Sequence, residues 1–302
     1  MSNNNNRKAI AIDGNSLLYR CFYATFKQLP YYAQHNIQPT NALNLFVYSI
    51  LKLLTSNKYD YAIVAFDHGK RTFRTAKYDL YKDGRKPMPK ELVVQLPEIK
   101  MSPELMGVLG MSLENYEADD LIGSFTKLMN KNNVSVEIYS SDRDMLQLVN
   151  ELNEIKLIKT GVSVFDHINI DNFKTKFFEL TPNQVVDYKG IAGDSSDHLK
   201  GIAGIGPKTA ASLLKQYGSL EGIYDHINEL PAKIQTKMND YKQQAFDCKE
   251  LATIYKDLFN EKELDMFATK VPNFDKLFEL TKKHNLNFLD SFIKNIQTLY
   301  KK

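Results

Sequence analysis

Three carboxylates stand within four positions of the segment YEADDLIG, residues 116–123, where an apolar-patterned stretch begins. They belong to Glu117, Asp119 and Asp120. Two like charges 4 Å apart repel by about 1 kcal/mol in water and by roughly 4 kcal/mol at an effective dielectric constant of 20. A bound divalent cation reverses the sign of that energy, and hard oxygen ligands favour Mg²⁺ or Mn²⁺ over Zn²⁺. The cluster is therefore a candidate site for metal-assisted chemistry.

More carboxylates follow the predicted strands. The Ile- and Val-rich runs KAIAID (8–13), YAIVAFD (61–67) and SVEIYSSD (135–142) are typical of buried strands, and each ends in aspartate. The residues are Asp13, Asp67 and Asp142, with Asp144 two positions further on. Ligands of open parallel sheets bind beyond the carboxyl ends of the strands, so these side chains are expected along one edge.

A structural interpretation of the same residues has to be weighed. An aspartate after a strand is often a turn or cap residue, and acidic side chains are favoured at the positive end of a helix dipole. The coincidence of three strand ends with an acidic cluster favours the metal site.

The elements that must position these residues alternate between strand and helix. Further strands are expected at 154–160 and 162–165, and helices near 40–56, 90–110 and 118–131. This alternation predicts an α/β fold, a mostly parallel sheet flanked by helices, over residues 1–170, and the mainly helical pattern beyond predicts a helical region over 171–302. In the simplest right-handed crossover, helix 118–131 starts at the sheet edge opposite the strand-end aspartates. A long or irregular segment before the helix would instead bring its start to the edge where the aspartates lie. The spacing of the residues leaves both arrangements open.

A second acidic pair, Asp194 and Asp197, lies in GIAGDSSDHLKGIAGIGPKTAASLLKQYG, residues 190–218. Upstream, Thr181 followed by Pro182 and Gln184 is a helix start with a capping box. Downstream, a helix is expected to begin at Pro207 and end at Gly218. Together these signals predict a helix–hairpin–helix over about 182–218.

The glycines of this hairpin suit a phosphate. The backbone N–H groups of Gly204 and Gly206 precede a helix N-terminus, and Lys208 adds a cation. A nucleotide-binding P-loop is rejected, because Pro207 precedes Lys208 and a helix rather than a strand leads into the loop. A glycine-rich turn with a purely structural role is the alternative.

Residues 68–90, called the basic segment below, combine cations with aromatic rings. The cations are Lys70, Arg71, Arg74, Lys77, Lys82, Arg85, Lys86 and Lys90, and the rings are Phe73, Tyr78 and Tyr81. Such side chains can neutralise phosphates and stack on bases, although a run like this is more often a solvated surface. Because the segment follows Asp67, it is expected to overhang the carboxylates.

Bulk composition excludes little. The 302 residues are 43% apolar and 25% charged, and the net charge of +3 gives no argument for a nucleic-acid partner from the total. The chain has no apolar run long enough for a membrane span or a signal segment. Cys21 and Cys248 are isolated and are expected to be reduced thiols of a cytoplasmic protein.

Six ordered blocks resemble the 5′-nuclease domain of bacterial DNA polymerase I, a member of the flap endonuclease superfamily. They are IDGNSLLYR (12–20), AFDHGKRTFR (65–74), YKDGRKPMP (81–89), YEADDLIG (116–123), SSDRDMLQLV (140–149) and GDSSDHLKGIAGIGPKTA (193–210). The resemblance implies a PIN-like (Rossmann-like) fold in which the EADD segment does reach the site. It also implies a structure-specific 5′ nuclease, both 5′-3′ exonuclease and flap endonuclease, that hydrolyses phosphodiester bonds by two-metal-ion catalysis in RNA primer removal and DNA repair.

Residue roles follow from the same resemblance. One metal group comprises Asp13, Asp67, Glu117, Asp119 and Asp120, and the other Asp142, Asp144, Asp194 and Asp197. Lys82 and Arg85 contact the scissile phosphate, and Arg20, Arg71, Arg74 and Lys86 hold the DNA backbone. Tyr81 stacks on a base, while Gly204, Gly206 and Lys208 grip the duplex. The implied cofactors are two or more Mg²⁺ ions, for which Mn²⁺ can substitute, and a K⁺ ion at the helix–hairpin–helix.

The chain departs from the family where DHLKG (197–201) replaces the common DNIPG, which alters the turn beside Asp197 through His198, Leu199 and Lys200. The expected partners are DNA with 5′ flaps, nicks or RNA primers and a separate DNA polymerase, because no polymerase segment follows; a standalone monomer is expected. Two alternatives stay open: a non-catalytic DNA-junction-binding module, and a ribonuclease of the PIN-like fold.

Overall fold

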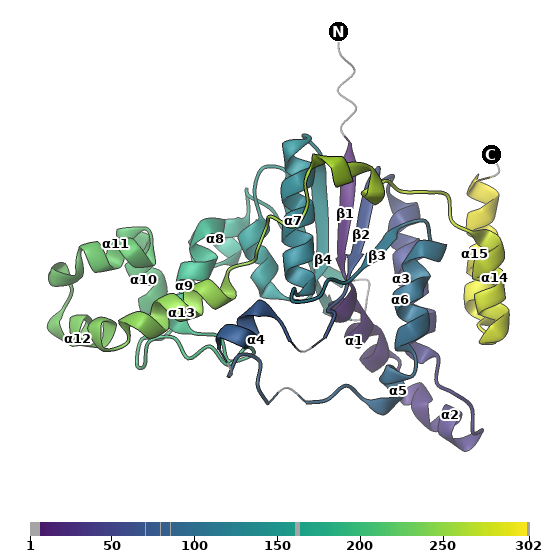
Figure 1. Ribbon diagram of the computed structural model, residues 1–302, viewed down its shortest axis with the longest axis horizontal. Coiled ribbons are helices and arrows are strands. Elements are labelled where there is room, and N and C mark those ends of the chain that lie inside the picture. Colours follow the sequence, from purple (N-terminus) through teal and green to yellow (C-terminus); the bar gives the residue numbers. More distant parts are fainter. Residues whose placement is uncertain (1–6, 70, 79, 85, 161–163, 301–302) are drawn as a thin grey trace, which may run out of the picture.

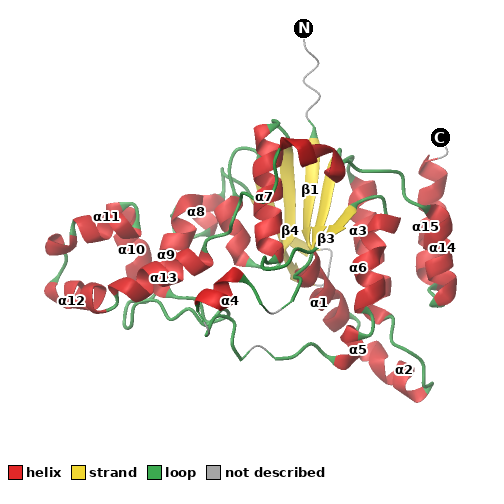
Figure 2. Ribbon diagram, in the orientation of Figure 1, coloured by secondary structure: helices red, strands yellow, loops and turns green. Residues whose placement is uncertain are grey.

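The computed structural model of the chain describes residues 7–69, 71–78, 80–84, 86–160 and 164–300. Its centre is a sheet with the strand order β3-β2-β1-β4-β5-β6, drawn in yellow in Figure 2. All neighbouring strands are parallel except the β5–β6 pair, which is antiparallel. The strands are β1 (Lys8–Asp13), β2 (Tyr61–Ala65), β3 (Leu109–Met111), β4 (Ser135–Ser140), β5 (Asn153–Thr160) and β6 (Val164–Ile168). The predicted α/β fold with a mostly parallel sheet is confirmed.

Both faces of the sheet are covered, which is why the central strands are apolar at every position. Ala9 and Ala11 of β1 belong to the same buried cluster as α7 (Ala118–Lys131). Ile10 and Ile12 belong to the opposite cluster, with α1 (Gly14–Ala24), α3 (Asn41–Ser56) and α6 (Leu96–Leu105). Figure 1 shows α7 beside the sheet on one side and α3 and α6 on the other.

The remaining helices complete the two sides. They are α2 (Leu29–Gln34), α4 (Phe73–Lys77), α5 (Lys90–Val93), α8 (Phe173–Lys176), α9 (Val185–Ala192), α10 (Pro207–Tyr217), α11 (Leu220–Asp225), α12 (Ala232–Asp240), α13 (Lys242–Ala252), α14 (Phe274–Lys283) and α15 (Asn287–Tyr300). Short 3₁₀ helices are η1 (Phe26–Gln28), η2 (Arg143–Leu148), η3 (Pro182–Gln184), η4 (Ile227–Glu229) and η5 (Glu261–Phe267).

One strand, β3, was not predicted, and it decides where α7 begins. The helix expected over 90–110 ends at Leu105, and β3 then runs parallel to β2. Its carboxyl end therefore lies at the same sheet edge as the ends of β1 and β2, so α7 starts at that edge. A strand of three residues gives too little periodicity to be recognised from sequence. Its Gly110 packs closely on α6, since a Cβ at this position would lie 3.1 Å from the Pro103 ring.

The predicted helix–hairpin–helix is present as η3 and α9, a loop, and α10. Thr181 and Gln184 form the expected capping box, and α10 begins at Pro207 and is capped by Gly218 at a φ of +82°. In Figure 1 this region extends to one side of the sheet.

The last two helices lie elsewhere. The α14–α15 hairpin packs against α3 and α6, and Leu289, Ile293 and Ile296 are buried in that cluster. In Figure 1 the α14–α15 hairpin lies beyond α3 and α6, on the other side of the molecule from α9–α13. A domain boundary near residue 170 stays a prediction.

No helix in the described ranges is both long enough and apolar enough to cross a membrane. Cys21 and Cys248 are buried free thiols.

Candidate metal and nucleic-acid site

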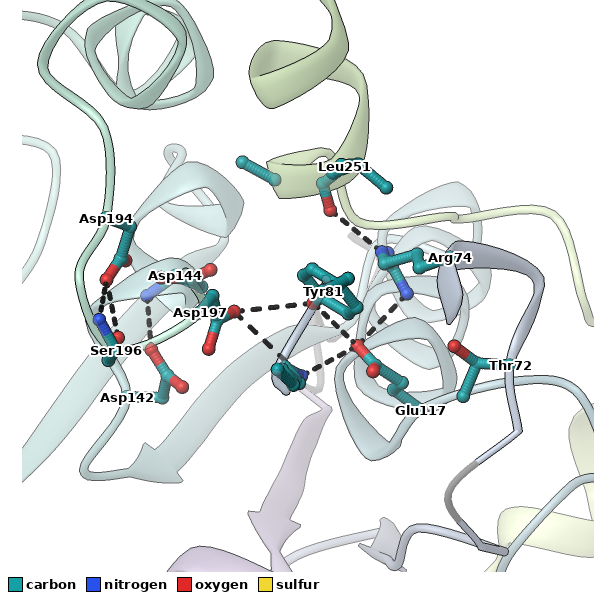
Figure 3. Close-up of polar contacts among 12 residues, drawn as sticks. Thr72, Arg74, Tyr81, Glu117, Asp142, Asp144, Asp194, Ser196, Asp197 and Leu251 are labelled. Carbon is teal, nitrogen blue, oxygen red and sulfur yellow. Dashed lines mark hydrogen bonds and ion pairs between the residues drawn. The ribbon is translucent and has the colours of Figure 1, made fainter. Parts of the chain in front are cut away.

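Carboxylates from both halves of the sequence meet in one cavity at the carboxyl edge of the sheet. The cavity has a volume of about 1020 Å³, and its lining includes Asp13, Asp67, Asp119, Asp142, Asp144 and Asp194. Figure 3 shows Asp142, Asp144 and Asp194 on one side and Glu117 on the other, with Tyr81 and Asp197 between them. Glu117, Asp120 and Asp197 lie behind this lining and are almost fully buried.

The strand ends hold their aspartates by local hydrogen bonds. Asp13 caps α1 by accepting from the Ser16 backbone N–H (2.9 Å), and it also accepts from the Ser140 hydroxyl (2.7 Å). Asp67 accepts from the backbone N–H of Ala118 (2.9 Å), at the first residue of α7. This bond ties the acidic cluster to the end of β2, as the resemblance implied. Asn15 donates to the other Asp67 oxygen (2.5 Å) and was not predicted.

Two of these carboxyl groups have too little positive charge nearby to offset the cost of ionising them in a buried position. Burial raises the pKa of Asp13 to about 7, and the nearby carboxylates of Asp67 and Asp142 add to this rise. Hydrogen bonds from Ser16 and Ser140 lower the pKa but do not offset the rise. Burial and the neighbouring Asp142 also raise the pKa of Asp119 well above its ordinary value, although Lys82 opposes this. Ionising both groups at neutral pH is unfavourable unless a cation comes close.

Asp120, which was predicted to belong to a metal group, is absent from the cavity lining. Its side chain is 0% exposed and forms a fork with the Arg74 guanidinium, at 2.7 Å for each oxygen. It also accepts from the backbone N–H groups of Glu117 (3.1 Å) and Tyr255 (2.9 Å). Asp120 therefore positions Glu117 and the start of α7.

Arg74, which was predicted to hold the DNA backbone, is buried as well. Besides the Asp120 fork it donates to Glu117 Oε2 (3.2 Å) and to the carbonyls of Leu251 (2.9 Å) and Thr253 (2.8 Å). With a relative exposure of 2%, its guanidinium is not available to a ligand. Arg74 instead joins α4, α7 and the end of α13.

Tyr81 is likewise not exposed for stacking on a base. It is 4% exposed, and its hydroxyl donates towards Glu117 Oε2 (3.2 Å) and Asp197 Oδ2 (3.3 Å). The neighbouring Lys82 lines the cavity, with its ammonium 2.9 Å from Glu117 Oε2 and 3.9 Å from Asp197 Oδ2. Burial acts against the charge of Lys82, but Glu117, Tyr81, Asp119 and Asp197 together outweigh it and raise the pKa, so the side chain is cationic at neutral pH.

Lys189 is the functional candidate that the sequence analysis missed. It lies in the last turn of α9, is 7% exposed, and pairs with both Asp144 and Asp194, the latter at 2.5 Å. Burial raises and Lys189 lowers the pKa of Asp194, which comes to about 2. The available signal was a lysine five residues before Asp194 in an otherwise mainly apolar helix.

A tight turn presents Asp194 and Asp197. The backbones of Asp194 and Leu199 are hydrogen-bonded in both directions, at 2.7 and 2.8 Å. Gly193 precedes the turn with a φ of +77°, and a Cβ there would lie 2.5 Å from the Leu199 carbonyl oxygen. His198 adopts a φ of +57°, and Leu199 is buried. The altered DHLKG residues thus keep Asp197 in the site.

The donor set fits a divalent cation. Oxygen ligands predominate, and two buried carboxyl groups have raised pKa values with few cationic neighbours. In the portion of the chain that the structure describes, no three side chains of the types Asp, Glu, His or Cys are grouped closely enough to hold one ion. Arg74, Lys82 and Lys189 instead pair with five of the nine predicted ligands: Glu117, Asp120, Asp144, Asp194 and Asp197.

The other predicted DNA contacts are at the surface or the cavity wall. Arg20 lines the cavity and donates to the Ile158 carbonyl (2.9 Å), whereas Arg71 and Lys86 are exposed. Arg85 lies outside the described residues. Gly204, Gly206 and Lys208 are exposed on the hairpin, where Lys237 of α12 donates to the Gly204 carbonyl (2.8 Å).

Family models match almost the whole chain. The model described as "5'-3' exonuclease, N-terminal resolvase-like domain" matches residues 8–178, and "5'-3' exonuclease, C-terminal SAM fold" matches 180–275. The carboxylates of the cavity thus come from both matched regions.

Among similar proteins, a 5'-3' exonuclease of Mycoplasma pneumoniae is 41% identical over 94% of this chain and 97% of its own length. The DNA polymerase I of Bacillus subtilis is 38% identical over 83% of this chain but only 28% of its own. Among solved structures, T5 5'-exonuclease with divalent metal ions (zinc) bound has a TM-score of 0.66 at 22% identity, covering 97% of this chain and 99% of that one.

Proposed function

The chain belongs to the 5'-3' exonuclease family, and from this premise we propose that it is a structure-specific 5′ nuclease, both exonuclease and flap endonuclease, that hydrolyses phosphodiester bonds with divalent metal ions. One observation carries the proposal: aspartates at the ends of β1, β2 and β4 share a cavity with Asp194 from the hairpin region. Bringing these negative charges together is unfavourable without bound cations. Divalent cations held by carboxylates in this way assist phosphodiester hydrolysis.

The ions, Mg²⁺ with Mn²⁺ as a substitute, would be held by two groups of side chains. The first is Asp13, Asp67, Glu117 and Asp119, with Asp120 supporting it through Arg74. The second is Asp142, Asp144, Asp194 and Asp197. Such ions, when bound, polarise the phosphate and activate water.

The chain's own cations then orient the substrate. The ammonium of Lys82 lies between Glu117 and Asp197, so it is placed to contact a phosphate that enters the cavity. Arg20 on the wall, Arg71 and Lys86 on the basic segment, and Lys208 on the hairpin would hold backbone phosphates on either side. These contacts carry no base information, so the enzyme should recognise the shape of a DNA junction rather than a sequence.

The proposed substrates are DNA with 5′ flaps, nicks or RNA-primed ends, and the proposed setting is a cytoplasmic monomer working beside a separate DNA polymerase. Arg85 remains a proposed phosphate contact. We also propose a K⁺ ion at the hairpin, where the Lys237 ammonium adds a second positive charge.

Cleavage of a 5′-labelled DNA flap tests this function. Incubation with Mg²⁺ is expected to release short 5′ products, and chelator should abolish them. Binding to the flap without cleavage under any divalent ion would favour the non-catalytic junction-binding module. Preferential cleavage of the matched RNA flap would favour the ribonuclease.

A further inference from the structure

The cationic side chains in the site differ in how they are held. Arg74 donates to two backbone carbonyls in addition to its carboxylate partners, so its planar fork is fixed on several sides. In the described ranges, the partners of the Lys189 ammonium are Asp144 Oδ1 and Asp194 Oδ2. Lys189 is thus a single flexible cation held by two carboxylates.

Those same two carboxylates belong to the second proposed metal group. They come from different elements, Asp144 from η2 and Asp194 from the turn after α9, and both line the cavity, as Lys189 does. An ion that binds both aspartates must take over oxygens to which the Lys189 ammonium is bonded. In contrast, no lysine among the described residues forms an ion pair with Asp13 or Asp119 of the first group, because Lys82 pairs with Glu117 there.

We propose that Lys189 is a built-in competitor for the second metal ion: its ammonium neutralises Asp144 and Asp194, and the ion binds there only by displacing it. This inference rests on the metal site of the proposed function and adds to it an order of binding. The first ion enters between Asp13 and Asp119, where the nearby Lys82 is paired with Glu117 rather than with these two aspartates. The second binds more weakly, and the displaced Lys189 stays in the cavity wall, where a substrate phosphate would enter.

If the ion pairs of Lys189 are purely structural, removing Lys189 should change metal affinity in the opposite direction. If Lys189 only held the end of α9 against η2, its removal would loosen Asp144 and Asp194 and weaken metal binding. If Lys189 competes, its removal must strengthen metal binding. The direction of the change therefore separates the two roles.

Calorimetric titration of the full chain with Mn²⁺, without DNA, tests the proposal. In Lys189→Met, which keeps the length and removes the charge, the weaker binding step is expected to tighten by about tenfold or more, as for loss of a charged hydrogen bond. The stronger step should not change. Lys249→Met is the matched control, because Lys249 also bridges two carboxylates, Asp187 and Glu221, but lies outside the cavity lining; its titration should match wild type.

Thermal unfolding gives a second readout in case Lys189→Met folds poorly. With chelator, Lys189→Met and the milder Lys189→Gln should melt below wild type, because Asp144 and Asp194 face each other uncompensated, and Mn²⁺ should raise their Tm more than that of wild type. Unchanged or weaker Mn²⁺ binding in both variants would overturn the competitor role of Lys189 but leave the proposed metal site standing. Absence of Mn²⁺ binding by wild type overturns the proposed metal site with it.

Discussion

Adjacent residues of the acidic cluster have different roles. Asp119 lines the cavity, whereas Asp120 points the other way into the Arg74 fork. The sequence EADD identified both as carboxylates of one cluster, but the direction of each side chain follows from the rotation of about 100° per residue around the helix axis. The same rotation makes their substitutions distinguishable.

Asp119→Asn is expected to lower flap cleavage by more than about 100-fold, since changes to residues outside the ligands already cost 10- to 100-fold. Its melting temperature with chelator should equal or exceed that of wild type, because a poorly compensated charge is removed. Asp120→Asn should lower the melting temperature, because it leaves buried Arg74 with a weakened partner. Equal thermal stability of the two variants would contradict these assignments.

The raised pKa of Asp13 gives a pH dependence. Its folded-state value of about 7 exceeds the ordinary value of 3.8, so the folded state binds this proton more tightly. With chelator, the contribution of Asp13 to stability therefore falls as pH rises from about 4 to 7. A divalent ion must displace the proton below pH 7 but not above it.

The increase in Tm caused by saturating Mg²⁺ should accordingly grow from pH 5.5 to 7.5 and level off above. Differential scanning calorimetry with Mg²⁺ and with chelator, at matched ionic strength, measures it. A Mg²⁺ effect that is constant across this range would show that no carboxyl with a raised pKa takes part.

At the scale of elements, hydrogen bonds and an ion pair hold α4 against α7 and the loop that precedes α7. The backbone N–H of Phe73 donates to the Asn115 carbonyl (3.1 Å), and Arg74 spans from α4 to Asp120 and to the Leu251 carbonyl. These contacts fix the beginning of the basic segment, while Lys82 further along it reaches Glu117. The segment is thus positioned by the very carboxylates that it overhangs.

Arg74→Met should lower the free energy of unfolding by about 3–5 kcal/mol, because it leaves Asp120 buried without its partner. Urea denaturation measures this change. Arg71→Ala, an exposed neighbour, should cost less than about 0.5 kcal/mol while weakening DNA binding. An Arg74→Met variant that keeps its stability and loses only DNA affinity would restore the role first expected for Arg74.

Sequence was sufficient for the long elements and insufficient for the short ones. The strand that ends at Asp13, the strand that precedes Asp67 and the capped helix at Pro207 were predicted from periodicity and end signals. The strand β3 was not, and the start of α7 was left undecided for that reason. Burial of Arg74 and Tyr81 could not be predicted, because it depends on α13, which is far away in the sequence.

At the scale of the molecule, residues from distant parts of the chain make both the site and the core. The hairpin region supplies Asp194, Asp197 and Lys189, while α15 returns to cover α3. Asp194 and Asp197 were predicted as ligands from the resemblance, whereas Lys189 was missed because its partners appear only in three dimensions. The return of α14 and α15 was also not foreseen.

Ile293→Ala in α15 should therefore lower the free energy of unfolding by about 2–5 kcal/mol, because Ile293 is fully buried. Its Mn²⁺ affinity should not change, since α15 lies against α3 and not in the cavity lining. Ser291→Ala, exposed on the same helix, is the control for stability. A loss of metal affinity in Ile293→Ala without loss of stability would contradict this separation.

The central claim, that both halves of the chain build one divalent-cation site, is tested most directly by Mn²⁺ stoichiometry. Equilibrium dialysis is expected to give two bound ions for wild type, and one fewer for Asp119→Asn and for Asp194→Asn. Wild-type protein that binds no Mn²⁺, or variants that both bind as wild type does, would contradict the account.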